Sequence, residues 1–333
     1  MEVIQKAAHT LFGTESPPPP SVKELNIYPI KSCAEIRVKS ATVTPRGFEN
    51  DRVLQVVSNV DGTWNLCTPR DRAFEKLFHI QPTFVDGGDS LQLSSPHASK
   101  VTVGLRGGGA SKKITASTMG RSEHPLEDYG DDVADWLEGA TGIDNNPRLV
   151  GIGENNNGFQ RCVEINPDQG EQLPALSDSS PIPVSLADEA PFLLTTQESL
   201  ADLNRRLESR GKDAVDMRRF RPNIVIGGLR PWEEDSLKRT KIGSVEFVVW
   251  QRCGRCTMTT IDRDTLKRCG EPLSTLSTFR ERDNGQRNFG VYLIPVCGGD
   301  DDEEKEVSLG NEIKILEYDE VRREEWRRLF GTP

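Results

Sequence analysis

The chain lacks several features that assign proteins to common classes. No run of about 18 apolar residues occurs, so no segment is expected to span a membrane. All four histidines lie within the first 124 residues, which excludes a histidine-based triad or a Cys2His2 zinc site from the second half. The sequence also has no glycine-rich phosphate-binding fingerprint and no internal repeat of 20–50 residues. Common nucleotide-binding and solenoid classes are therefore not indicated.

The charge and cysteine content indicate the kind of ligand and the cellular compartment. The net charge of the 333 residues is −10, yet arginines cluster in 218–221, 252–255 and 280–287. An acidic chain with local arginine clusters is not typical of a nucleic-acid partner and fits a pocket for a small anion. The seven cysteines are an odd number and no secretory signal precedes them, so we expect free thiols in an intracellular compartment, either the cytoplasm or a mitochondrion.

The distribution of strand-like segments and the length of the chain both predict two domains. Both halves hold many short segments with alternating apolar and β-branched residues, and no regular alternation of strands with helices. The predicted fold class is mainly β with some α, with two β-barrel-like domains and peripheral helices. The expected divisions are a disordered or loosely docked leader at 1–21, a first domain at 22–150, a linker at 151–182, a second domain at 183–320 and a helical tail at 321–333.

A few elements can be placed with their ends. Residues 131–141 and 198–208 carry apolar residues at helical spacing, and each is expected to be an amphipathic helix. The segment FLLTT, 192–196, reads as a short strand whose last threonine can cap the second of these helices. The segment TMTTID, 257–262, reads as a strand.

The stretch WQRCGRCTMTTID, 250–262, is the strongest chemical signal. It places Cys253 and Cys256 two residues apart with Arg252 and Arg255 interleaved, and a neighbouring cation stabilises a thiolate. Zinc binding would need Cys269 as a third ligand and Cys297 as a fourth. A redox pair normally opens a helix, whereas this one precedes a predicted strand. Buried, unreactive thiols are a third possibility, and these alternatives stay open on the residues alone.

Two further segments indicate an anion site. In MRRFRPN, Pro222 is expected to hold Arg221 in an extended conformation, so that Arg219 and Arg221 point to one side together with Asn223. Two guanidinium groups and an amide on one strand face would suit a phosphate or a pterin. The segment YPIKSC, 28–33, adds a lysine and a serine after a strand end, which can also hold an anion. Solvated strand edges and ordinary turn polarity are the plainer interpretations.

The motifs together resemble a known family. The segments NIYPIKSC, NDRVLQVV, TPRDR, SLADEAPFLLTTQESLADLNRRL, FRPNIVI, RCGRCTMTTIDRDT, EPLSTL and NFGVYL occur in the order found in MOSC proteins. These have an N-terminal MOSC β-barrel domain followed by a MOSC domain, and the likeness is greatest to the amidoxime-reducing type and its bacterial relatives. Molybdenum-cofactor sulfurases share the architecture but add a large pyridoxal-phosphate domain, and pyridoxal phosphate binding is also associated with the family at large.

The resemblance implies a cofactor and its ligands. The cofactor would be Mo-molybdopterin, with Cys256 rather than Cys253 as the thiolate on molybdenum. The residues implied to contact the cofactor are Lys31, Ser32, Arg52, Thr196, Ser199, Arg219, Arg221, Asn223 and Tyr292. Asp262 is a candidate for a local proton or hydrogen-bond role beside Cys256, and a turn residue is the plainer interpretation of it.

The implied activity is the reduction of a small N-hydroxylated compound, N–OH to N–H plus water, with electrons from a b-type cytochrome and its flavin reductase. A carrier of the cofactor or of sulfur, without redox turnover, is the alternative. Three segments depart from the family pattern: the SPPPP leader stands where a membrane anchor is expected, 208–217 is longer, and 297–306 inserts acidic residues. These departures put a mitochondrial outer-membrane location in question.

Overall fold

The computed structural model describes residues 18–105, 112–118, 122–153, 159, 161–163, 181–282, 285–296 and 305–331. Most of the leader and of the predicted linker, and the acidic block at 300–304, lie outside these residues. Within them, no helix is long and apolar enough to cross a bilayer.

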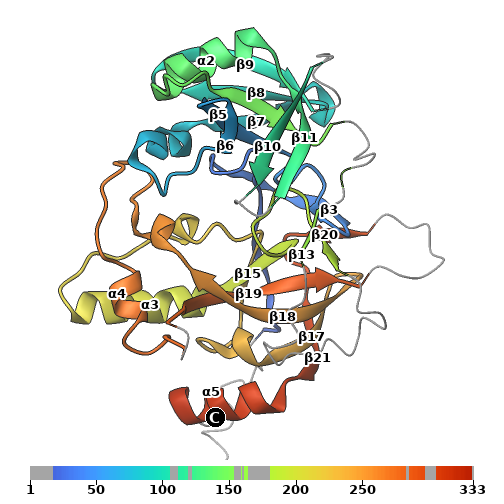
Figure 1. The fold of residues 1–333 in the computed structure, drawn as a ribbon. Helices are drawn as coiled ribbons and strands as arrows, with labels where there is room; N and C mark the ends of the chain where they lie inside the picture. The colour runs from blue at the N-terminus through green and yellow to red at the C-terminus, as the bar shows by residue number, and fades with distance from the viewer. Residues whose placement is uncertain are drawn as a thin grey trace, which may run out of the picture.

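The first half is built on a closed five-stranded barrel, drawn at the top of Figure 1. The barrel strands follow the order β10 (Lys113–Thr118), β11 (Ser122–Asp128), β12 (Arg148–Gly151), β5 (Leu54–Val60) and β6 (Thr63–Leu66). A three-stranded sheet lies beside it, made of β7 (Gln81–Val85), β8 (Ser90–Ser95) and β9 (Ala98–Gly104). The short helical turns of this half are η1 (Arg72–His79) and η2 (Asp86–Gly88).

Helix α2, Asp131–Thr141, covers the barrel with the apolar stripe predicted for it. Val133, Trp136, Leu137 and Ala140 are all buried in the core of this half. The helix ends because Gly142 adopts a left-handed conformation with φ of 75°, where glycine carries little steric cost, and its N–H bonds the carbonyl of residue 138.

The second half is built on a curled eight-stranded sheet. Its order is β2 (Ile36–Val38), β1 (Ser21–Ile27), β16 (Ile224–Gly227), β15 (Phe192–Thr196), β19 (Arg287–Pro295), β18 (Val245–Arg255), β17 (Leu237–Ile242) and β21 (Ile313–Tyr318). The remaining strands are β3 (Ser40–Thr44), β4 (Gly47–Phe48), β20 (Glu306–Ser308), β13 (Cys162–Val163) and β14 (Ile182–Pro183). With the barrel of the first half, this sheet confirms the predicted mainly-β class.

Helices and turns surround this sheet. They are α3 (Gln197–Ser209), η5 (Met217–Arg219), η6 (Glu233–Ser236), η7 (Thr257–Thr260), α4 (Leu273–Leu276) and α5 (Glu320–Phe330). Figure 1 shows α5 at the end of the molecule farthest from the barrel.

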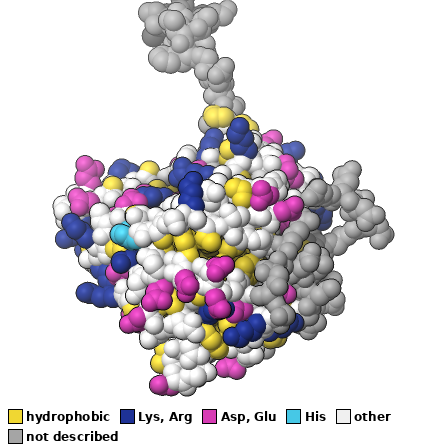
Figure 2. All heavy atoms as spheres, turned by 90° about the horizontal axis from the view of Figure 1, so that it is seen from above, with side chains coloured by type: hydrophobic (Ala, Val, Ile, Leu, Met, Phe, Trp, Pro, Cys, Tyr) yellow, Lys and Arg dark blue, Asp and Glu magenta, His cyan; other side chains and the backbone are white. Residues whose placement is uncertain are grey.

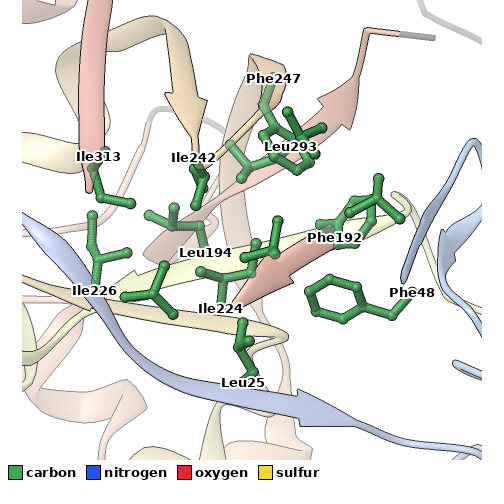
Figure 3. Packing of buried hydrophobic residues seen from close by; sticks show 14 of the residues in the cluster. Leu25, Phe48, Phe192, Leu194, Ile224, Ile226, Ile242, Phe247, Leu293 and Ile313 are labelled. Atoms are coloured by element: carbon green, nitrogen blue, oxygen red, sulfur yellow. The ribbon is translucent and has the colours of Figure 1, made fainter. Parts of the chain in front are cut away.

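Aromatic rings hold the curled sheet together on its inner face, as Figure 3 shows. Phe192 lies between two other rings, with its centroid 4.9 Å from that of Phe48 and 5.5 Å from that of Phe247, both edge-to-face at 83°. All three are buried, and aliphatic side chains from neighbouring strands fill the rest of the core. Truncating one such ring to alanine typically costs about 3–5 kcal/mol.

The first three strands of the chain pair with strands of the second half or with each other: β1 and β2 in the eight-stranded sheet, and β3 in a separate sheet with β20 and β4. Strand β1 pairs antiparallel with β16, with Leu25 opposite Ile224, and β3 pairs with β20. Residues 21–44 are thus hydrogen-bonded to strands that follow them by about 200 residues or more, although the sequence grouped them with the first domain. The domain boundaries drawn from the sequence remain a hypothesis.

Two local predictions are wrong. Residues 257–260 form a 3-10 turn rather than a strand, because the hydroxyls of Thr259 and Thr260 bond the carbonyls three residues earlier. Arg221 is left-handed, with φ of 57°, rather than extended. Proline at 222 disfavours the right-handed region for Arg221, and the N–H of Arg221 closes a turn onto the carbonyl of Arg218.

Candidate cofactor site

A cavity of about 200 Å³ is lined by residues of both halves of the chain. Its walls come from the ends of strands and from the connections between them, which is where polar side chains can converge without breaking a sheet. The predicted site residues that line it are Lys31, Ser32, Arg52, Arg219, Arg221, Asn223, Cys256 and Tyr292. The further lining residues used below are Arg70, Asp188, Glu189, Cys253 and Arg255.

Two predicted contacts lie elsewhere. Thr196 caps helix α3 through its hydroxyl, which accepts from the N–H of Ser199 at 3.0 Å. The hydroxyl of Ser199 donates to the buried carboxyl of Glu234 at 2.7 Å. Burial, reinforced by neighbouring Asp235, raises the pKa of Glu234 to about 8. Neither Thr196 nor Ser199 is among the cavity-lining residues, so their observed contacts are those of a helix cap.

Asp262 also lies outside the cavity lining. Its carboxylate accepts from the N–H and hydroxyl of Thr265 at 2.8 and 2.7 Å, and Arg219 pairs with it at 2.9 Å. These bonds, those from Thr265 first, lower the pKa of Asp262. The carboxyl is therefore ionised at neutral pH and suited to hold the turn and Arg219. Its proton role stays a prediction.

The two cysteines of the CxxC segment have different surroundings. Cys256 follows the last residue of β18, begins η7 and is partly exposed in the cavity. Cys253 lies within the strand, is 2% exposed, and has its Sγ 2.7 Å from Nη1 of Arg255. Burial raises the pKa of the Cys253 thiol, against the influence of Arg255. Only Cys256 combines partial exposure with a position in the cavity.

The geometry disfavours the redox and zinc interpretations. Three steps along an extended strand separate the α-carbons of Cys253 and Cys256 by roughly 10 Å, more than a disulfide spans. In the described part of the chain, no group of three histidine, cysteine or acidic side chains could hold a metal ion. Cys269 is exposed and its Sγ approaches the backbone carbonyls of 260 and 271, while Cys297 lies outside the described residues.

The two arginines of the CxxC segment, Arg252 and Arg255, also have different surroundings. Arg255 points into the cavity, as expected. Arg252 does not: it pairs with Asp235 and Glu325 and lines a different surface. Since successive side chains of a strand point to opposite faces, an arginine directly before Cys253 cannot share its side of the sheet. The cation near Cys256 comes instead from Arg70, whose Nη2 lies 3.7 Å from Sγ.

Arginine side chains gather on one ring at the cavity wall. The guanidinium carbons of Arg52 and Arg221 each lie 4.3 Å from the centroid of Tyr28. Arg52 pairs with Asp51, whereas Arg221 donates only to the carbonyl of Cys33 and has no carboxylate partner in the described structure. Burial first, and then the charge of nearby arginines, lowers the pKa of Arg221 to about 10.

The charge of the cavity lining shows whether an anionic cofactor would fit there. The cavity lining holds six cationic side chains and two carboxylates. One of the cations, Arg221, is destabilised by its own surroundings, which a phosphate would reverse by supplying the missing anion. A partly exposed thiol in the same cavity supplies the soft ligand that a thiophilic metal prefers. The residues present fit a cofactor that carries both a phosphate and a metal.

The predicted residue Lys31 pairs with Asp188, which the sequence did not indicate as a site residue. Lys31 is buried and donates to the carbonyl of Leu186 at 2.6 Å and to the carboxylate of Asp188. Burial opposes the ionisation of Asp188, but Lys31 and Arg70 outweigh it and lower the pKa of Asp188 to about 2. The same burial lowers the pKa of Lys31. This ion pair lies in the same cavity wall as Arg221, the arginine without a carboxylate partner in the described structure.

The missed residues lay in quoted motifs. Arg70 stands in TPRDR, and Asp188 and Glu189 in SLADEAP, but nothing in their spacing shows that loops about 120 residues apart meet at one thiol. The structure shows how the first loop is held. Arg268 bonds the carbonyls of Pro69 and Arg70, at 2.7 and 3.2 Å, and pairs with Glu75.

Fold and site together define a class: a β protein with an arginine-rich cavity that contains a partly exposed thiol and is lined by residues of both halves. Residues 20–144 match the model of the MOSC N-terminal beta barrel domain, and residues 181–314 match the MOSC domain. The chain belongs to the MOSC family.

Curated relatives fall into two groups. The chain is 31% identical to human mitochondrial amidoxime-reducing component 1 over 82% of this chain and 78% of that protein, and 32% identical to the mouse protein over 84% and 76%. It is 31% identical to molybdenum cofactor sulfurase of Danio rerio over 82% of this chain. That match covers 32% of the sulfurase, so the chain spans about a third of the sulfurase length. The comparisons therefore relate the chain to molybdenum-cofactor proteins, and they lend no support to pyridoxal phosphate.

Proposed function

We propose that this protein is a molybdenum-cofactor-dependent oxidoreductase that reduces N-hydroxylated compounds. The observation that carries the proposal is the single cavity in which the partly exposed Cys256 and an uncompensated arginine, Arg221, lie together. The similarity to amidoxime-reducing components over about three quarters of their length supports the reaction class.

In this proposal the cofactor's anionic group is held by Arg52, Arg221 and Lys31, with the amide of Asn223 and the hydroxyl of Ser32 as further partners. Cys256 would be the protein ligand of molybdenum. When bound, this cofactor supplies two-electron chemistry that converts N–OH to N–H plus water.

The chain's own residues would orient the cofactor and form the walls of the cavity around Cys256. Asn223 is fixed by the N–H of Leu193, which donates to its Oδ1 at 3.2 Å, and by the carbonyl of Asn26 at 3.3 Å. Half-buried Tyr292 and buried Cys253 line the cavity wall beside Cys256. Arg70 lies on the more open side, near the thiol. A small substrate would therefore enter past Arg70 and the carboxylate of Glu189.

Electron supply and location extend the proposal. Electrons would come from a b-type cytochrome and its flavin reductase, in the cytoplasm or a mitochondrion. Figure 2, which shows the molecule from above, has lysine, arginine and acidic side chains intermixed, without one continuous patch of either sign among the described residues in view. A carrier of the cofactor or of sulfur, with Cys256 as the sulfur-bearing residue, is the second candidate because the sulfurase similarity is equally high.

Metal analysis joined to turnover tests the proposal. The purified chain should contain molybdenum near one equivalent and reduce benzamidoxime with a chemical electron donor. Cys256→Ser should lose both the metal–thiolate signature and turnover, while Cys269→Ser, at an exposed thiol outside the cavity, should retain both. Cys253→Ser decides which thiol is the ligand and should keep the metal signature.

Two results would contradict it. A metal-free chain that carries cyanide-labile sulfur would favour the carrier. A Cys256→Ser chain with full molybdenum-dependent turnover would refute the ligand assignment while leaving the reaction class intact.

A further inference from the structure

A second cavity, of about 620 Å³, opens behind the strands that carry the candidate cofactor thiols. Arg252 lines this cavity, whereas its neighbour Cys253 lines the first one. Consecutive side chains of a strand point to opposite faces, so the two cavities lie on the two sides of β18. The rear arginine pocket is defined by Arg252, Thr278, Arg280, Arg282, Asn288 and Arg328.

Two of its arginines are held rigidly. The carboxylate of Asp235, with its side chain 2% exposed, lies 3.1 Å from Nε of Arg252 and 2.6 Å from Nη2 of Arg280. Glu325 adds a contact of 2.7 Å to Arg252. The guanidinium groups are 7% and 4% exposed, so their orientation is fixed before any ligand arrives.

The pocket carries more positive than negative charge. Its lining has four arginines against two carboxylates, Glu281 and Glu325, and Asp235 behind them adds a third carboxylate, so one positive charge is left over. Glu281 also pairs with Arg287 at 3.3 Å, and Glu325 with Arg252. Arg328 extends from α5 and has no ion pair in the described structure. The hydrogen bond from Arg252, and the charges of Arg282 and Arg280, lower the pKa of Glu325, as expected where the local potential is positive.

A buried amide in the pocket has an unmet hydrogen bond. Asn288 is 2% exposed and lines the cavity, yet its Oδ1 has no partner in the described part of the chain. More than nine tenths of buried polar groups in proteins have one. An amide can present its oxygen or, turned over, its NH2 to a ligand. An amide with an unmet hydrogen bond beside fixed guanidinium groups suits a polar ligand, and the guanidinium groups favour one that carries negative charge.

We propose that the rear arginine pocket binds a small phosphate ester. Guanidinium groups favour phosphate because their paired N–H groups match its oxygens, and the hydroxyl of Thr278 adds a polar contact. Phe279 and Leu329 line the same cavity and give the organic part of the ester an apolar wall. The volume is within the range of small-molecule sites. This site is distinct from the cofactor cavity and does not depend on the proposed activity.

Calorimetric titration of the full chain with phenyl phosphate and with inorganic phosphate, at constant ionic strength, tests the proposal. Because the cofactor cavity also attracts phosphate, the titration uses the Arg221→Gln background. The expected result is one binding site, tighter for phenyl phosphate than for inorganic phosphate because of Phe279.

Two variants locate the site. Arg328→Gln is at an exposed position, so its fold is retained, and it should weaken binding at least fivefold. Asn288→Ala should weaken it further. Arg323→Gln is the matched control, since Arg323 lies on the same helix but bonds Glu320 and stacks on Tyr318 outside the pocket, and it should leave affinity unchanged. Absence of binding, equal loss in the Arg323 and Arg328 variants, or no loss in Arg328→Gln would each overturn the proposal.

Discussion

Arg221 should oppose folding of the cofactor-free protein. Its guanidinium has no carboxylate partner in the described structure, and burial beside other arginines lowers its pKa to about 10. The group is still protonated at pH 7, so the chain holds an unfavourable charge there. A difference of this size from a free guanidinium corresponds to about 3 kcal/mol against the folded state. The sign follows because the unfolded chain binds this proton more tightly, and the penalty is relieved only as pH rises through the folded pKa.

Arg221→Gln removes that charge and keeps a side chain of similar reach at a left-handed position. It also loses the contact with the ring of Tyr28, worth about 0.5–2 kcal/mol. The net expectation is a gain in the free energy of unfolding of about 1–2 kcal/mol for the cofactor-free chain, together with weaker retention of the cofactor. Urea unfolding with and without bound molybdenum measures both effects.

Arg263 provides the opposite case. It is more deeply buried than Arg221 but pairs with Glu35 at 2.9 Å, with the two side chains 5% and 10% exposed. Arg263→Gln leaves a buried carboxylate unpaired and should cost about 3–5 kcal/mol. If both substitutions destabilise the cofactor-free chain, the inference that the charge of Arg221 is unfavourable without a bound anion is wrong.

Two further predictions concern stability. The pKa of Asp188 is lowered to about 2, so its stabilising pairing with Lys31 is present above the unfolded pKa and is lost as pH falls toward 2. In urea unfolding at a series of pH values, the stability advantage of wild type over Asp188→Asn should shrink between pH 5 and 2.5. A constant advantage would contradict this. Gly290 has φ of 77°, and a Cβ there would lie 2.6 Å from the backbone oxygen of Leu194, so Gly290→Ala should cost more than about 2 kcal/mol in thermal unfolding. Gly139→Ala in α2, where nothing lies within 4 Å, should instead stabilise by roughly 0.5–1 kcal/mol, and equal effects of the two would refute the steric argument.

Short-range signals predicted the local structure well. The strand at 192–196 and the helix at 131–141 have the predicted ends, because each is specified by neighbouring residues: a short apolar run and a capping threonine in one, an apolar stripe at helical spacing in the other. Where competing local bonds exist, the pattern failed. The threonines of 257–260 have strand propensity, but their hydroxyls close a turn with the preceding carbonyls.

The site was predictable only in part. Eight of the predicted residues line the cavity because they lie in motifs whose order and spacing resemble a family. Arg70 and Asp188 were missed because their meeting depends on the packing of two separate loops. Thr196 and Ser199 were placed in the site, yet their hydroxyls serve the start of α3 and the buried carboxyl of Glu234. The sequence shows which residues are polar, but not whether their hydrogen bonds are made in the cavity or elsewhere in the fold.

The pairing of β1 with β16 imposes a waiting time on the growing chain. Leu25 leaves the ribosome about 200 residues before its partner Ile224, which at 5–20 residues per second is roughly 10–40 s. During this interval β1 can pair only with the short strand β2, and by its end every strand of the barrel has been made. The barrel can therefore close first, while β1 still lacks its partner β16, and the thiol-bearing sheet is completed only when the end of the chain returns to its beginning.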